Sequence, residues 1–193
     1  LEGVPYNLLL EYLPGTSFEA YCHRLPERAQ TLGIETFQLA GRIIGDVLEG
    51  LHLVHRHDIL HRDLSPENVV VTEDETGDRA VIIDFGISAL RGDGDETFGS
   101  GTFGSGTFAV RAPEVDAGDP YTEQSDLYSV GVLLFMALTD ELPYVTEQGV
   151  EKATLREDLL SDEELIPGPL SDLLRRTLAV SPMDRPESAL GMR

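Results

Sequence analysis

The fold is decided by residues 57–71, which read His57-Asp-Ile-Leu-His-Arg-Asp-Leu-Ser-Pro-Glu-Asn-Val-Val-Val71. The apolar residues Ile59-Leu60 and Val69 to Val71 predict a short β pair that brackets a polar loop. This loop carries Asp63 and, five residues later, Asn68. On one rigid loop, a carboxylate can accept the proton of an attacking hydroxyl while an amide oxygen binds Mg²⁺ on nucleotide phosphates. The spacing therefore indicates phosphoryl-transfer chemistry.

Two further motifs follow in order. Residues 79–86, Arg-Ala-Val-Ile-Ile-Asp-Phe-Gly, predict an apolar strand that ends at Asp84, a second aspartate suited to a metal ion. Residues 112–114 read Ala-Pro-Glu. The ordered set HRDLSPEN, DFG and APE resembles the C-terminal lobe of a eukaryotic-type protein kinase. The ordered set is specific, whereas Asp-Phe-Gly alone is also an ordinary strand end followed by a turn.

The resemblance implies a fold and a domain assignment. We expect an α+β fold, mostly α, with a helical lobe and short β pairs, in a single partial kinase domain over residues 1–193. Residues 1–17 would be the last N-lobe strand and the hinge, and residues 18–193 the C-lobe with its last helix truncated. The glycine loop, strand lysine and partner glutamate of the N-lobe are absent, and Lys152 lies downstream of every motif. We therefore expect the parent protein to be the enzyme and the isolated chain to be inactive.

The resemblance also implies the activity. This is transfer of the γ-phosphate of ATP, with Mg²⁺, to serine or threonine hydroxyls of protein substrates. Asp63 would be the base, Asn68 and Asp84 the Mg²⁺ ligands, and Thr107 would help to orient Asp63. The residues expected to line the nucleotide site are Leu10, Glu11, Leu13, Ser17, Val70 and Ile83.

Arg62, which precedes the expected base, implies regulation. In the family such an arginine pairs with a phosphate on the activation segment. Candidate phosphorylation sites are Thr97, Ser100, Thr102 and Ser105. A tandem repeat, Gly-Ser-Gly-Thr-Phe, occupies this region and contains G-x-G-x-x-G at residues 99–104. That pattern is typical of a phosphate-covering loop, but such a loop belongs upstream of the hinge, so we interpret the repeat as part of the activation segment.

One departure from the family keeps alternatives open. Ser65 stands where Ser/Thr kinases usually place a lysine that touches the transferred phosphate. Loss of that charge would lower the rate or change the substrate class. A pseudokinase scaffold is a separate alternative, which an upstream sequence without the strand lysine would indicate. A small-molecule phosphotransferase of the aminoglycoside type shares the two aspartates and the asparagine, but it does not carry the arginine of HRD, here Arg62, or the APE motif that ends at Glu114.

Two long-range contacts are implied by the resemblance. Asp126 resembles the aspartate that holds the backbone of the catalytic loop, although a carboxylate there could equally be a first-turn dipole partner. Glu114 and Arg185 would form a buried ion pair. His61 is expected to be the buried histidine of HRD. His52 and His55 could share a helix face, but neither a cysteine nor an ordered second shell accompanies them, so we expect no metal site there.

Periodicity predicts the remaining elements. Apolar residues at intervals of three and four mark one long helix, and they are Phe37, Ala40, Ile43, Ile44, Val47, Leu48, Leu51 and Val54. The other expected elements are an apolar strand at 4–13 stopped by Pro14-Gly15, helices at 18–24, 34–56, 127–138 and about 170–178, and a stretch at 147–165 that is acidic and loop-like around short helical pieces.

Composition limits the partners. The chain has 35 Asp and Glu against 14 Lys and Arg, a formal net charge of -21. Such a surface repels nucleic acid and anionic membranes, so we expect neither as a partner. A halophilic host and a GC-rich genome explain the scarcity of lysine equally well.

Length and apolar runs indicate a cytoplasmic protein. The longest apolar run, Val130 to Leu138, is about half of what a membrane-spanning helix requires. The chain opens without a charged-then-apolar leader. Its single cysteine, Cys22, cannot form an internal disulfide.

Overall fold

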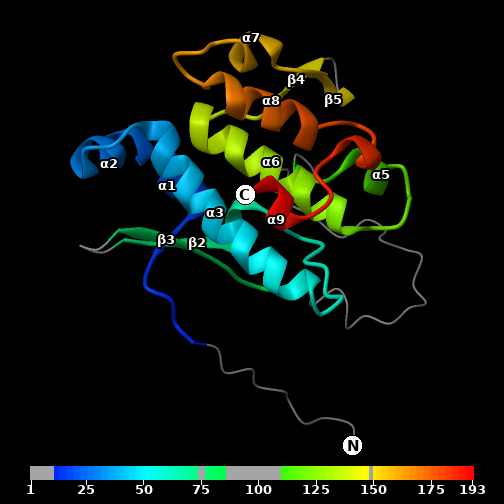
Figure 1. The fold of residues 1–193 in the computed structure, drawn as a ribbon, viewed down its shortest axis with the longest axis horizontal. Helices are drawn as coiled ribbons and strands as arrows, with labels where there is room; N and C mark the ends of the chain where they lie inside the picture. Colours follow the sequence, from blue (N-terminus) through cyan, green and yellow to red (C-terminus); the bar gives the residue numbers. More distant parts are fainter. Residues whose placement is uncertain (1–10, 74–76, 86–109, 148–149) are drawn as a thin grey trace, which may run out of the picture.

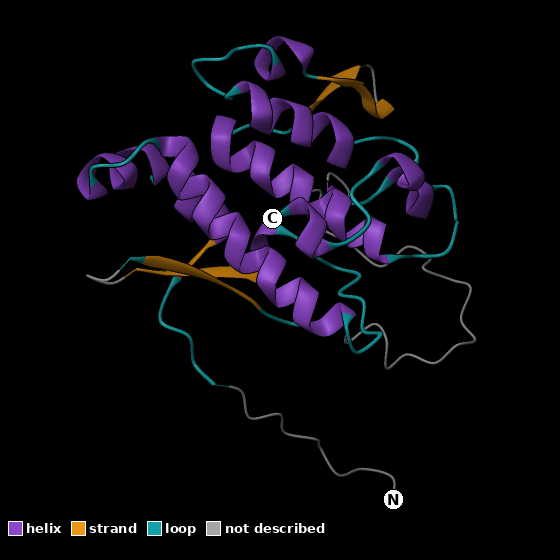
Figure 2. Cartoon of the chain, viewed as in Figure 1, coloured by secondary structure: helices purple, strands orange, loops and turns teal. Residues whose placement is uncertain are grey.

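The computed structural model describes residues 11–73, 77–85, 110–147 and 150–193. Helices dominate, and the strands form two small antiparallel sheets (Figure 2). The elements in chain order are β1 (Thr16–Ser17), α1 (Phe18–Cys22), α2 (Leu25–Leu32), α3 (Thr36–His55), the 3-10 turn η1 (Pro66–Asn68), β2 (Val69–Glu73), β3 (Asp78–Ile82), α5 (Pro113–Asp116), α6 (Glu123–Thr139), β4 (Tyr144–Glu147), β5 (Val150–Leu155), α7 (Glu157–Leu160), α8 (Gly168–Thr177), the 3-10 turn η3 (Pro182–Asp184) and α9 (Ala189–Met192).

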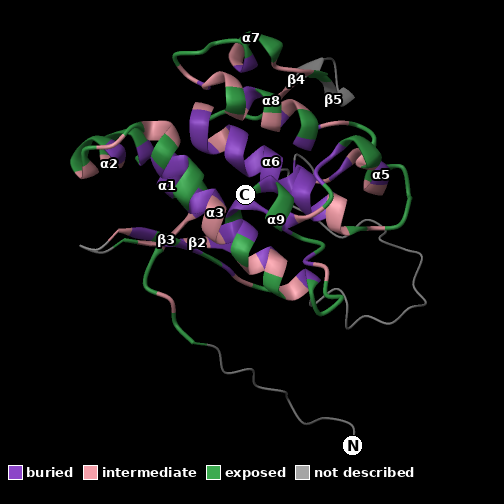
Figure 3. Cartoon of the chain, in the orientation of Figure 1, coloured by how far each residue is buried: buried purple, intermediate pink, exposed green. Residues whose placement is uncertain are grey.

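Two long helices, α3 and α6, pack against each other at the centre (Figure 1). The sheet β1-β2-β3 lies along one side of α3, and α8 lies on the opposite side of α6. The buried residues concentrate along α3 and α6 (Figure 3). The core is therefore continuous from the small sheet through α3 and α6 to α8.

Helix α3 forms where its apolar stripe predicts it. Glu35 and Gln38 form a capping box that satisfies free N–H groups at its first turn. All eight predicted stripe positions are buried or pack against the core. The helix thus buries one face against both the sheet and α6, as an amphipathic helix does.

Helix α6 is buried on nearly every side, as its sequence predicts. Thr122 and Ser125 form a capping box at its start. Asp140 ends the helix in the left-handed conformation, with a φ of 57°. Gly131 allows α8 to approach closely, because a Cβ there would lie 2.8 Å from Thr177 Cγ2. Helix α6 is therefore the central support of the helical part of the fold.

A buried carboxylate joins the first helices to the sheet. The Asp78 side chain, at the start of β3, is fully buried. It accepts hydrogen bonds from Tyr21 Oη at 2.6 Å, Arg28 Nε at 2.8 Å and Arg28 Nη2 at 2.6 Å. Because a buried carboxylate is stable only when it is paired and hydrogen-bonded, these contacts hold α1 and α2 against the β2–β3 hairpin.

The predicted pairing of Ile59-Leu60 with Val69 to Val71 is wrong. Strand β2 pairs with β3 on one side and with β1 on the other. Ile59 and Leu60 lie in a loop. Asp58 and Arg62, on either side of them, have positive φ angles of 58° and 67°, which no extended strand adopts.

Two more elements differ from the sequence prediction. The hairpin of β4 and β5 starts at Tyr144 and runs to Leu155, into the stretch expected to be loop-like, whereas the short helix α7 agrees with the helical pieces expected there. Four β-branched residues, Val145, Thr146, Val150 and Thr154, favour strands here, whereas the acidic residues of the stretch led to its interpretation as a loop. Helix α2 was not predicted, although Pro26 near its start and Gly33 after its end are typical helix boundaries.

The expected strand at 4–13 is tested only at its end. Residues 1–10 lie outside the described part of the chain, and residues 11–15 do not form a strand. Gly15 passes directly over β2, where a Cβ would lie 2.5 Å from the Val71 carbonyl oxygen. Only glycine permits this approach. Within the described residues, no helix is long and apolar enough to cross a membrane.

The packing of α6 on α8 predicts that alanine at Gly131 destabilises the protein, whereas alanine at an uncrowded glycine stabilises it. Gly131→Ala is expected to lower the free energy of unfolding by about 1–2 kcal/mol, because the new methyl group overlaps Thr177. The control is Gly41→Ala in α3, where a Cβ meets nothing within 4 Å. That change is expected to raise the free energy by about 0.5–1 kcal/mol through helix propensity. Urea denaturation measures both, and stabilisation by Gly131→Ala would contradict the close packing.

Candidate active site

The loop that carries Asp63 is held by one buried carboxylate. We call residues 61–68 the HRD loop. Asp126, in the first turn of α6, is fully buried. It accepts hydrogen bonds from the backbone N–H groups of His61 at 2.9 Å and Arg62 at 3.1 Å, and from Tyr121 Oη at 2.8 Å. The prediction that Asp126 holds this loop is confirmed, and its role is more than that of a first-turn dipole partner.

Two partners of Asp126 were missed by the sequence reasoning. His55 Nε2, at the end of α3, lies 2.8 Å from Asp126 Oδ2 and must donate, because a carboxylate only accepts. Burial and the Asp126 charge raise the pKa of Tyr121 well above its ordinary value, so the phenol remains a donor. His55 is 71 residues away from Asp126 in sequence. No local pattern signals such a contact.

His61 connects the HRD loop to the segment that follows β3. It is fully buried, as predicted. Its Nδ1 accepts from the Asp63 N–H at 3.3 Å, so Nε2 carries the proton and donates to the Ile83 carbonyl oxygen at 3.1 Å. The ring also meets Phe85 edge-on at a centroid distance of 5.0 Å. His61 thereby fixes both Asp63 and the residues around Asp84.

Asp63 and Asn68 are brought together as their spacing predicts. Asn68 Nδ2 donates to the Asp63 carbonyl oxygen at 2.7 Å and to Asp63 Oδ2 at 3.2 Å. The Asp63 side chain remains exposed. Because the amide nitrogen of Asn68 is used by Asp63, its Oδ1 is the atom left for a cation. The pair therefore combines a reachable base with a fixed oxygen ligand.

Asp84 lies beside the same loop. The Ile83 N–H donates to the Asn68 carbonyl oxygen at 2.9 Å, which extends the pairing of β2 and β3 by one residue. Asp84 is exposed and has a φ of 57°, an uncommon value for a residue other than glycine. The two predicted metal ligands, Asn68 and Asp84, thus sit on adjacent, hydrogen-bonded segments.

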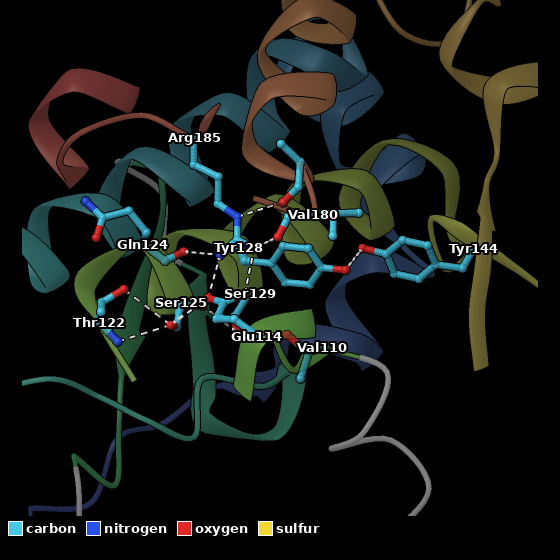
Figure 4. A network of polar contacts seen from close by, with 11 residues as sticks. Val110, Glu114, Thr122, Gln124, Ser125, Tyr128, Ser129, Tyr144, Val180 and Arg185 are labelled. Atoms are coloured by element: carbon cyan, nitrogen blue, oxygen red, sulfur yellow. Dashed lines mark hydrogen bonds and ion pairs between the residues drawn. The ribbon is translucent and has the colours of Figure 1, made fainter. Parts of the chain in front are cut away.

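The predicted ion pair between Glu114 and Arg185 is confirmed (Figure 4). Arg185 donates to both oxygens of Glu114, at 2.8 and 2.7 Å, and Ser125 Oγ donates to Glu114 Oε1 at 2.8 Å. The Arg185 guanidinium also lies 4.7 Å from the centroid of the Tyr128 ring. Burial alone would raise the pKa of Glu114, but the bonds from Arg185 and Ser125 outweigh it, and the pKa is lowered.

Of the residues predicted to line the nucleotide site, Ser17, Val70 and Ile83 lie in or next to the small sheet, and Glu11 and Leu13 lie before it. Ser17 pairs with Val70, and Val70 pairs with Val81, so the three share the face of the sheet that points away from α3. Ile83 follows two residues after Val81. Val81 is 36% exposed, which leaves this face open. Glu11 and Leu13 lie in the segment before β1, the first exposed and the second half-buried.

Several predicted residues lie outside the described part of the chain. These are Leu10, Thr107, the tandem repeat and the candidate phosphorylation sites Thr97, Ser100, Thr102 and Ser105. Arg62, their expected partner, is exposed at the HRD loop. Among the described residues, no group of three or more His, Cys, Asp or Glu is placed to hold a metal ion by itself.

The chain belongs to the protein kinase domain family, whose model matches residues 3–191. It is 28% identical to serine/threonine-protein kinase 17A of Oryctolagus cuniculus over 92% of this chain and 44% of that protein. It is 32% identical to serine/threonine-protein kinase mos of Xenopus laevis over 76% of this chain and 40% of that protein. It is 29% identical to serine/threonine-protein kinase PknB of Mycobacterium tuberculosis over 98% of this chain and 29% of that protein. The chain thus spans less than half the length of these relatives.

Solved structures agree on the fold. The crystal structure of a mutant PknI kinase domain of Mycobacterium tuberculosis matches 94% of this chain and 60% of its own, with a TM-score of 0.61 and 22% sequence identity. At that identity the likeness concerns the fold alone. The helix-rich chain with a small antiparallel sheet fits the predicted α+β, kinase-like class.

The Glu114–Arg185 pair yields a stability prediction. Glu114→Gln is expected to lower the free energy of unfolding at neutral pH by about 3 kcal/mol, because it leaves the Arg185 charge buried without its counter-ion. The control, Asp172→Asn, changes a side chain that is 83% exposed and is expected to have an effect below about 0.5 kcal/mol. Urea denaturation of the two variants gives the comparison.

The same pair predicts a pH dependence. A carboxyl whose pKa is lowered on folding adds stability above its unfolded pKa, and that stability is lost as the pH falls through the folded value. The stability difference between wild type and Glu114→Gln should therefore be largest above the ordinary pKa of 4.5 and should shrink in more acidic solution. A difference that stays constant or grows on acidification would contradict the assigned contact.

Proposed function

We propose that the protein containing this chain is an ATP-dependent protein kinase that phosphorylates serine or threonine in protein substrates. The observation that carries the proposal is the joint placement of Asp63, Asn68 and Asp84. Asn68 is hydrogen-bonded to Asp63 through its side chain and to Ile83, the neighbour of Asp84, through its backbone. The Ser/Thr kinases among the relatives support the same activity.

The roles of the residues follow from their contacts. The exposed Asp63 carboxylate would accept the proton of the substrate hydroxyl, whose oxygen forms a bond to the γ-phosphorus of ATP while ADP leaves. Asn68 and Asp84 offer an amide oxygen and a carboxylate oxygen, hard ligands that suit Mg²⁺. Bound there, Mg²⁺ would neutralise phosphate charge. Since Mg²⁺ also takes phosphate oxygens and waters as ligands, the two residues fit the ion.

The nucleotide would rest on the open face of the small sheet. Ser17, Val70 and Ile83 present this face, and the segment with Glu11 and Leu13 leads into it. An apolar floor suits an adenine ring, whose hydrogen bonds are made at its edge. We further propose the lobe assignment, in which residues 1–17 are the last N-lobe strand and hinge and residues 18–193 are the C-lobe of a single kinase domain. We also propose that Leu10 lies beside the nucleotide and that Thr107 helps to orient Asp63.

Ser65 does not place a charge at the transferred phosphate. The residue is 3% exposed, and its carbonyl oxygen accepts the Asn68 N–H at 3.0 Å. The residue therefore supports the turn that presents Asn68. Any cation at the transferred phosphate has to come from another residue or from Mg²⁺, so we propose a slower phosphoryl transfer than with lysine at this position.

The base assignment is tested by an isosteric substitution. Asp63→Asn in the full-length protein is expected to lower kcat by a factor of about 100–10,000, because the amide cannot accept the proton. The matched control is Asp58→Asn, another exposed loop aspartate, whose φ of 58° asparagine readily adopts. Transfer of radiolabelled phosphate from ATP to a generic protein substrate is the readout. Equal transfer by wild type and Asp63→Asn would refute the role of Asp63.

A further inference from the structure

Among the described residues, one buried side-chain polar atom, Nδ1 of His55, has no hydrogen-bond partner. His55 lies in the last turn of α3 and is 6% exposed. Because its Nε2 donates to Asp126, the neutral ring carries its proton at Nε2 and leaves a lone pair on Nδ1. A buried polar atom without a partner destabilises a fold, so the environment of Nδ1 needs a closer look at its neighbours.

The group that Nδ1 faces is a carboxylate. Glu123, in the first turn of α6, places Oε2 3.6 Å from Nδ1, beyond hydrogen-bond distance. In the neutral ring, the lone pair of Nδ1 and the negative oxygen repel each other. A proton on Nδ1 turns the contact into a charge-assisted hydrogen bond once Oε2 moves by less than about 1 Å. The Glu123 side chain is 40% exposed, so solvent leaves room for this movement.

The buried charge of Asp126 favours a proton at the same place. Four groups bond to its carboxylate, and they are Tyr121 Oη, His55 Nε2 and the backbone N–H groups of His61 and Arg62. Of these four, only His55 can become positive. A buried carboxylate is stabilised by a counter-ion, and the C-terminal end of α3 favours a cation through the helix dipole. An imidazolium at His55 therefore suits both of its acidic neighbours.

The other ionisable groups around His55 do not take over this role. His61, on the HRD loop, already uses both ring nitrogens in hydrogen bonds. On α3 itself, His52 is half-buried and Arg56 is exposed, and the Arg62 side chain of the HRD loop is exposed as well. Solvent and salt screen charges at such positions. Uptake of a proton in this cluster is thus assigned to His55.

We propose that Glu123, His55 and Asp126 form a pH-sensitive attachment of the HRD loop, which is tighter when Nδ1 of His55 carries a proton. Imidazole is the side chain that ordinarily gains or loses a proton between pH 5 and 8. With the proton, the ring binds both carboxylates and ties the end of α3 to the start of α6. Without it, the bond to Glu123 is absent and the bond to Asp126 loses its charge assistance. A histidine that gains a partner on protonation adds stability at lower pH, and that stability is lost as the pH rises.

The consequence for phosphate transfer rests on the proposed kinase function, whereas the consequence for the loop does not. His55 is a positioning residue in this scheme, since it acts on Asp63 only through Asp126 and the HRD loop. The attachment should hold Asp63 more firmly at pH 6 than at pH 8. Carboxylic acids in general stay ionised in this range, so imidazole is the group that responds.

Glu123→Gln in the full-length protein tests the attachment. The glutamine amide can donate to the unprotonated Nδ1, which makes the contact independent of the added proton. The matched control, Glu27→Gln, removes an exposed acidic side chain from the first turn of another helix, α2. Long-range proton–nitrogen NMR spectra follow the histidine rings, and His55→Gln assigns the signal. We expect wild type and the control to carry a proton on Nε2 alone at pH 8 and on both nitrogens at pH 6, and Glu123→Gln to keep Nδ1 unprotonated.

Hydrogen exchange reports on the loop without requiring turnover. The protection factors of the His61 and Arg62 amides should be about threefold to tenfold larger at pH 6 than at pH 8 in wild type and in the control. They should be nearly equal at the two pH values in Glu123→Gln. A His55 ring that stays neutral at pH 6 in wild type would overturn the inference. So would protonation that leaves the loop amides unchanged, or a pH response that Glu123→Gln shares with wild type.

Phosphate transfer tests the link to catalysis. The ratio of kcat in Glu123→Gln to kcat in wild type should be close to one at pH 6 and about two to five at pH 8, and a ratio cancels the pH effects that the two proteins share. A ratio that does not change with pH would overturn the control of catalysis, even with a responsive loop. Absence of transfer by wild type at every pH would overturn the proposed function instead, and the NMR and exchange results would still decide the attachment.

Discussion

The arrangement of the active site depends on the burial of one carboxylate. Asp126 is removed from water, and a charge in that position is tolerated only when hydrogen bonds replace its hydration. The backbone N–H groups of His61 and Arg62 supply two of these bonds. In return, the loop backbone is held with Arg62 in a left-handed conformation that its own sequence disfavours. The stability of α6 is thus linked to the geometry of the HRD loop.

Helix α6 holds two segments in place, the HRD loop and residues 110–116, with three polar side chains. Ser125 binds Glu114, Asp126 binds the HRD loop, and Ser129 binds Val110. Each of these polar groups lies on a helix that is otherwise apolar and buried, so each needs a partner from outside the helix. These partners lie in the loop that carries Asp63, the proposed base, and in the segment that carries Glu114, the partner of Arg185. The same helix therefore forms the centre of the core and holds the segments of the candidate site in place.

The sequence predicted the elements with strong local signals. The stripe of α3 and the uniformly apolar α6 are long and periodic, and both were confirmed. The roles of Asp126, Glu114 and Arg185 came from the family resemblance, since their partners lie 61 to 71 residues away and leave no local trace. The strand predicted at Ile59 and Leu60 does not form, and the reason is physical. Their β propensity is overridden because the next two N–H groups bond to Asp126 instead of to a strand.

Hydrogen exchange tests the central claim most directly. In Asp126→Asn, the amide nitrogen of the new side chain must face a donor, so at least one of the His61 and Arg62 N–H groups loses its acceptor. The account predicts that this N–H exchanges at least about tenfold faster than in wild type, while the core amide of Val132 keeps its protection. Unchanged exchange of both loop amides would contradict it, and so would an equal increase at Val132, which would show general destabilisation in place of a local attachment.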